Sequence, residues 1–254
     1  MVTPDTTTDP QERNTPVESS EAPAKRPRSF RTLPAAILAF GLGAALLYLG
    51  VPRAIEAVWT YSAGRTLLDI QSQQEVSDED IRNLIADLQD TMFLVESGRK
   101  WTDLGLAQLL LSARTEAGPQ ARELLVQSRD SIKKGLGLAL ANSFAWTRLA
   151  YVESLIGGPS AQVADYLELA ILTAPYEPRS QFLRLQLVFL AWPYFQEKDR
   201  NLVLQQARYV WRQAPRLFVD LALEAAQADL AREALARDPD GLERFEKMLE
   251  EKPS

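Results

Sequence analysis

The sequence predicts an all-α protein in which one transmembrane helix is followed by an α-solenoid of short helical hairpins. Two observations predict this fold. Residues 32–52 contain no charged side chain, and four basic residues come directly before them: Lys25, Arg26, Arg28 and Arg31. After this stretch, Ala, Leu, Glu, Gln and Arg dominate, and they favour helices. No segment combines the period-two alternation and the hairpin turns that are typical of strands.

Residues 1–31 form the first segment, which we expect to be a disordered cytoplasmic tail. The segment is rich in Pro, Thr, Ser and Glu and has almost no large apolar side chains. Such a composition cannot bury enough surface to offset the entropy lost on ordering. Basic residues resist translocation, so the tail is predicted to stay in the cytoplasm and the chain after Pro52 to lie beyond the membrane.

Residues 32–52 are predicted to be the transmembrane helix. At 1.5 Å per residue the stretch is about 31 Å long, close to the hydrocarbon thickness of a bilayer. A cleaved signal peptide is the alternative. The long segment before the apolar stretch and the lack of a small-x-small cleavage site after it favour an uncleaved anchor.

Residues 53–98 are expected to form membrane-proximal helices. Ser77 precedes three acidic residues, Asp78, Glu79 and Asp80. A Ser oxygen can accept hydrogen bonds from open backbone amides, and carboxylates complement the positive end of a helix dipole. The sequence therefore predicts a helix start at Ser77, and the alternative of a metal site is less favoured.

Residues 99–254 are predicted to be a domain of helical repeats that ends in capping helices. The pattern Trp101-x-x-Leu104-Gly105 recurs as Trp146-x-x-Leu149-Ala150, and the aromatic residue returns at Phe182 and Phe218. The large ring can fill the gap between two antiparallel helices, while Gly105 or Ala150 lets their backbones approach. One such hairpin cannot bury its apolar face alone, so neighbouring hairpins are expected to stack.

These repeats resemble the tetratricopeptide family, whose pattern begins W-x2-L-G-x2-Y and ends with Ala and Pro. The resemblance covers about residues 100 to 235 and is degenerate, since Gln108 and Glu153 stand where the family has an aromatic residue. The layout and the run at residues 141–150 are also similar to VpsP-type accessory proteins of polysaccharide biosynthesis. This resemblance implies a bacterial inner-membrane protein with a cytoplasmic N-terminus, a periplasmic C-terminal domain and other envelope proteins as partners.

Composition excludes several kinds of chemistry. The chain has no Cys and no His, which removes disulfides, thiol nucleophiles, imidazole catalysis and the usual zinc and haem ligands. Its net charge of -6 argues against a nucleic-acid binder. No catalytic, cofactor-binding or metal-binding residue stands out, so the sequence predicts no enzyme and no cofactor.

Two groups of residues are candidates for a partner surface. The first is the aromatic cluster Trp192, Tyr194 and Phe195, which could instead seal its hairpin. The second is Arg148 and Arg184, equivalent in their repeats, which could line a concave groove or belong to a solvated helix face. The expected function is a membrane-anchored scaffold for protein–protein interaction in envelope or exopolysaccharide biosynthesis. A periplasmic domain that binds or modifies carbohydrate is the alternative, and the oligomeric state stays open.

Overall fold

The computed structural model describes residues 33–59, 61–93 and 95–252, and within them every regular element is a helix. The chain divides into two compact units, Met1–Leu47 and Tyr48–Ser254. The predicted disorder of residues 1–31 lies outside the described residues. The helices are α1 (Leu33–Trp59), α2 (Tyr61–Gln71), α3 (Asp78–Thr91), α4 (Gly98–Arg114), α5 (Pro119–Leu138), α6 (Ser143–Gly157), α7 (Ala161–Thr173), α8 (Gln181–Ala191), α9 (Glu197–Gln213), α10 (Pro215–Glu224), α11 (Ala228–Leu235) and α12 (Pro239–Glu250).

The predicted transmembrane helix is wrong. Among the residues that the structure describes, no helix combines the length and the apolar character that crossing a membrane requires. The predicted localisation, a single-pass inner-membrane protein with a periplasmic C-terminal domain, is corrected with it.

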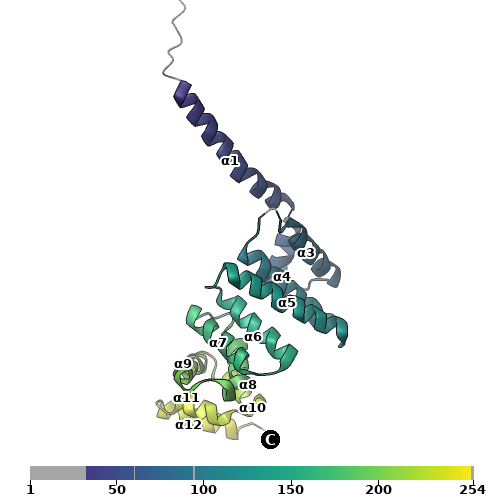
Figure 1. The fold of residues 1–254 in the computed structure, drawn as a ribbon. Coiled ribbons are helices and arrows are strands. Elements are labelled where there is room, and N and C mark those ends of the chain that lie inside the picture. The colour runs from purple at the N-terminus through teal and green to yellow at the C-terminus, as the bar shows by residue number, and fades with distance from the viewer. Residues whose placement is uncertain (1–32, 60, 94, 253–254) are drawn as a thin grey trace, which may run out of the picture. The chain divides into compact units, whose positions relative to one another are not determined.

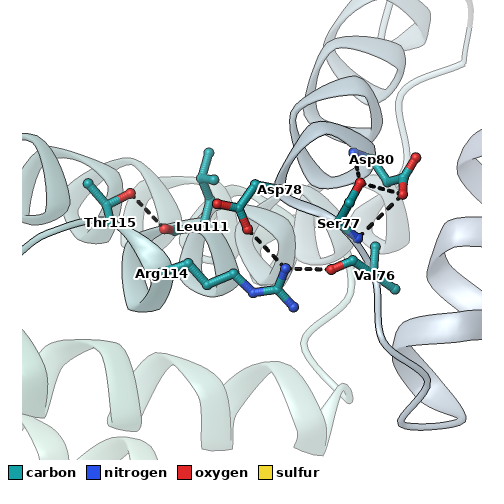
Figure 2. A network of polar contacts seen from close by, with 7 residues as sticks. All are labelled: Val76, Ser77, Asp78, Asp80, Leu111, Arg114 and Thr115. Carbon is teal, nitrogen blue, oxygen red and sulfur yellow. Dashed lines mark hydrogen bonds and ion pairs between the residues drawn. The ribbon is translucent and has the colours of Figure 1, made fainter.

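The predicted helix start at Ser77 is confirmed. Ser77 Oγ accepts a hydrogen bond from the Asp80 amide at 3.1 Å, and the Asp80 carboxylate accepts one from the Ser77 amide at 3.3 Å. Figure 2 shows how Arg114 of α4 reaches this end of α3, where its guanidinium donates to the Val76 carbonyl and to the Asp78 carboxylate. The cap therefore starts α3, and Arg114 ties this end of α3 to α4.

The helices from α2 to α12 pack in chain order, as the sequence of colours in Figure 1 lets the reader follow. Each of these helices contacts the next one. The first helices of successive hairpins also contact one another, in the pairs α4 with α6, α6 with α8, α8 with α10, and α10 with α12. This pattern of contacts is consistent with an α-solenoid.

Glycines bring α4 and α5 close together. A Cβ atom on Gly105 would lie 2.5 Å from Ile132 Cγ1, and one on Gly135 would lie 2.7 Å from the Gly98 carbonyl oxygen. The prediction that Gly105 lets two helix backbones approach is confirmed. The helices α4 and α5 therefore pack at close range.

The repeated aromatic residues pack against the core. Phe218 is fully buried, next to Phe189, Trp211 and Phe245. The other three, Trp101, Trp146 and Phe182, are half-buried against three neighbouring clusters of apolar side chains. These rings therefore help to hold neighbouring helices together.

Candidate functional site

A polar cavity of about 500 Å³ lies across the first helices of three successive hairpins, α4, α6 and α8. Its walls come from these helices, from the end of α2 and from the turn before α8. The polar side chains that matter for its chemistry are Arg99, Thr102, Asp103, Thr147, Arg148 and Arg179. In this cavity, charged side chains from α4, from α6 and from the turn before α8 come together.

Two helix caps position these side chains. Ser97 Oγ accepts from the Lys100 amide at 3.2 Å and starts α4, and Asn142 Oδ1 accepts from the Ala145 amide at 3.1 Å and starts α6. In both helices the two residues that follow the repeated tryptophan (Trp101 or Trp146) line the cavity. They are Thr102 and Asp103 on α4 and Thr147 and Arg148 on α6. Since the tryptophan faces the core, the residues after it lie on the face that turns toward the cavity.

Asp103 is the electrostatic centre of the cavity. Its Oδ2 atom lies 3.6 Å from Nε of Arg99. Burial raises the pKa of the Asp103 carboxyl, while the charges of Arg148 and Arg99 oppose that rise. Burial also lowers the pKa of Arg148, and Asp103 opposes that shift. Three arginines and one aspartate line the cavity, so its formal charge is +2.

Arg184 does not share the position of Arg148, although the two are equivalent in sequence. Its side chain is fully buried. The guanidinium donates to four neutral acceptors, at distances between 2.8 and 3.2 Å: Ala174 O, Gln206 Oε1, Ser143 Oγ and Ser180 Oγ. Burial lowers the pKa of Arg184 to about 10, against the opposing charge of Glu177. Arg184 thus lies inside the fold, where a partner has no access to it.

The aromatic cluster after α8 is divided between core and surface. Phe195 is buried, and Trp192 is half-buried against the core cluster around Phe189, with the Arg200 guanidinium 5.1 Å from its ring centre. Tyr194 is exposed. Most of this cluster therefore covers the C-terminal core, and Tyr194 alone of the three rings faces solvent.

Sequence reasoning missed Arg99, Asp103 and Arg179 as site residues. The sequence contained part of the information needed to find them. Asp103 follows Trp101 by two residues, just as Arg148 follows Trp146 by two residues. When two residues of opposite charge occupy equivalent positions in adjacent repeats, their side chains can come close together once the repeats stack. Arg179 carried no such signal, since it lies in the turn before α8.

Metal chemistry has no support in the described ranges, where no group of three or more acidic, His or Cys side chains could hold an ion. The resemblances to tetratricopeptide repeats and to VpsP-type accessory proteins stay predictions. No protein-family model matches the chain, and a search of curated proteins finds no match either.

Proposed function

We propose that the helical array is a protein-binding module that holds an acidic segment of a partner against α4, α6 and α8. The observation that carries this proposal is the cavity shared by the first helices of three hairpins, with its formal charge of +2. Stacked hairpins expose a continuous face on which an extended segment can lie. The mechanism is recognition, and no bond is made or broken.

The cavity has the groups that such a partner needs. Arg99 and Arg179 are exposed, and a guanidinium can donate two parallel hydrogen bonds to a carboxylate. Phe144 and Leu183 add apolar surface for a neighbouring side chain of the partner. Asp103 repels an incoming carboxylate, so it favours a segment whose acidic groups lie beside the outer arginines.

Catalysis on a sugar polymer has less support. Among the described residues that line the cavity, Asp103 is the one carboxylate. Glycoside hydrolysis ordinarily uses two carboxyl groups across the scissile bond. The predicted link to envelope polysaccharide biosynthesis and to envelope partners stays a prediction, because it rests on the layout of the sequence.

Photo-crosslinking tests the proposal and identifies the partner. We would place p-benzoylphenylalanine at Phe144, in the cavity, and at Arg122, on the exposed side of α5, in two separate variants expressed in the native cell. A protein that crosslinks from position 144 and not from position 122 is the expected result. Equal crosslinking from both positions contradicts a dedicated binding face.

The crosslinked segment, made as a labelled peptide, then allows a measurement of affinity by fluorescence anisotropy. Arg99→Glu and Arg179→Glu reverse charges in the cavity, and each should weaken binding at least tenfold because like charges then face the acidic segment. Arg122→Glu is the matched control and should change the dissociation constant less than twofold. An equal loss in all three variants would show attraction to overall charge instead of a site.

A further inference from the structure

A second cavity, of about 450 Å³, lies at the C-terminal end of the array. It is lined by residues of α9, the end of α11 and the start of α12, and it shares no residue with the cavity across α4, α6 and α8. Three arginines line it, namely Arg208, Arg212 and Arg237. We call it the arginine cavity.

The arginines of this cavity lack anionic partners in the described part of the chain. Arg208 donates weakly, at 3.4 Å, to the Ala234 carbonyl, and none of the three takes part in the ion pairs found among described residues. Arg232, on the neighbouring α11, is paired with both Asp229 and Glu246. Two carboxylates thus neutralise Arg232. The three arginines of the cavity have no such ion pair among the described residues.

The spacing on α9 adds to this unbalanced charge. Arg208 and Arg212 are four residues apart and share one face of the helix. Like charges at this spacing repel each other in an isolated helix. An anion held between them would convert that repulsion into two attractive contacts.

The indole of Trp211 also lines the cavity. Trp211 is 4 % exposed, and its ring packs edge-on against Phe218 and Phe245. Its indole Nε1 has no hydrogen-bond acceptor among the described residues, although buried tryptophans usually find one. A Cβ atom on Gly241 would lie 3.1 Å from Nε1 and 2.5 Å from Asp238 Oδ2, so the absent side chain of Gly241 leaves room for the Asp238 carboxylate beside the indole. An acceptor atom in the cavity would satisfy this N–H.

The one carboxylate among the described residues that line the cavity is engaged through one of its two oxygens. Asp238 Oδ1 accepts from the Gly241 amide at 3.1 Å and caps the N-terminus of α12, whose positive dipole end offsets its charge. The cavity therefore presents three guanidinium groups and one indole N–H against a single capped carboxylate. Its formal charge is +2.

We propose that the arginine cavity binds the phosphoryl group of a small phosphorylated molecule, a phosphate monoester or a diphosphate. A phosphate monoester approaches a charge of -2 at neutral pH, which matches the cavity, and its several oxygens can accept from more than one guanidinium. The volume is within the range of small-ligand sites. A single carboxylate offers one negative charge and two oxygens, so it uses fewer of these donors.

Isothermal titration calorimetry of the whole protein tests this proposal at constant ionic strength. The probes are pyrophosphate and glucose 1-phosphate, with glucose and citrate as comparisons. Both phosphorylated probes should bind, glucose should not, and citrate should bind at least tenfold more weakly than pyrophosphate. Arg212→Gln and Arg237→Gln should each weaken pyrophosphate binding at least tenfold, and Trp211→Phe, which keeps an aromatic ring without the N–H, should weaken it several-fold.

Arg216→Gln is the matched control, because Arg216 is exposed on α10 and does not line the cavity. This control should change the dissociation constant less than twofold. Circular dichroism of each variant checks that the helices remain. The proposal is overturned by undetectable binding of both phosphorylated probes, by equal or tighter binding of citrate, or by an equal loss in Arg216→Gln.

Discussion

Arg184 shows how a charged residue serves the interior of this protein. Its guanidinium reaches the starts of α6 and α8, the end of α7 and the middle of α9 through four neutral acceptors. Its Nε atom and Gln206 Nε2 remain without partners. A buried cation costs solvation energy, and here hydrogen bonds instead of a carboxylate offset most of that cost.

Replacing Arg184 by Ala should lower the free energy of unfolding by about 3 kcal/mol or more, because the change opens a cavity and leaves buried acceptors unpaired. Urea unfolding followed by circular dichroism measures the loss. Gln186→Ala, at an exposed position of the same helix, is the control and should change stability by no more than about 0.5 kcal/mol. Equal stability of the two variants would contradict a structural role for Arg184.

Asp103 predicts a pH dependence. Burial raises the pKa of its carboxyl in the folded state above the unfolded value near 4, so the folded state binds this proton more tightly. Its ionised form therefore lowers stability at neutral pH, and this cost disappears as the pH falls through the raised pKa. Asp103→Asn cannot titrate.

The stability difference between Asp103→Asn and the natural protein should therefore be most positive at pH 7 and should decrease as the pH falls toward 4. Urea unfolding at pH 7, 5 and 4 measures this trend. A difference that grows on acidification would mean that the arginines, and not burial, control this carboxyl. The same substitution should also strengthen binding of the acidic segment at pH 7, since it removes a repelling charge.

At the scale of the helix pair, glycines decide how closely α4 and α5 pack. A Cβ on Gly135 would lie 2.6 Å from Thr102 Cγ2 and 2.7 Å from the Gly98 carbonyl oxygen, whereas a Cβ on Gly137 meets nothing within 4 Å. The two glycines lie in the same helix, two residues apart. They form a matched pair in which only the surroundings differ.

Gly135→Ala should destabilise the protein by about 1 to 3 kcal/mol, because α4 and α5 must separate to admit the methyl group. Gly137→Ala should be neutral or stabilising by up to about 1 kcal/mol, because Ala favours helix over Gly. Thermal and urea unfolding of both variants provide the measurement. Similar effects of the two changes would exclude close backbone packing as the role of Gly135.

The helices and their local signals could be read from the sequence, while the positions of side chains between repeats could not. The roles of Ser77 and Gly105 could be predicted because a helix cap, and a close approach of two helix backbones, depend on only a few neighbouring residues. Arg184 was misplaced because its spacing from Phe182 gives a helix face but not the neighbours of that face. The apolar stretch at residues 32–52 led to a predicted membrane span that the structure does not support.

The candidate sites were harder to predict for the same physical reason. Asp103 and Arg148 lie on different hairpins, and Arg179 lies in a turn, so only the stacking of repeats brings them to one cavity. The arginine cavity likewise joins α9 to the start of α12. Spacing within one helix contains no information about such distant neighbours.

At the scale of the whole molecule, the array from α2 to α12 is held by contacts between neighbouring helices. In such an array stability is approximately a sum of local terms, so damage at one end stays near that end. Phe245 of α12 offers a test. It is fully buried against Trp211 and Phe218.

Phe245→Ala should lower stability by about 3 to 5 kcal/mol, because the loss of its ring leaves a cavity in the C-terminal core. Hydrogen exchange measured by mass spectrometry should show lost protection in α9 to α12 and nearly unchanged protection in α4 and α5. Lys247→Ala, exposed on the same helix, is the control. A uniform loss of protection along the chain would indicate one cooperative unit instead of a divisible array.

Arg184 also supports the wall of the cavity across α4, α6 and α8, although it does not line that cavity. The same guanidinium nitrogen that holds Ser143 at the start of α6 holds Ser180 at the start of α8, and Ser180 lines the cavity. Arg184 therefore links the N-terminal ends of α6 and α8 through hydrogen bonds to Ser143 and Ser180. If the proposed partner binds in this cavity, substitutions of Arg184 should abolish binding although Arg184 does not line the cavity, and a genetic screen for lost binding should recover them.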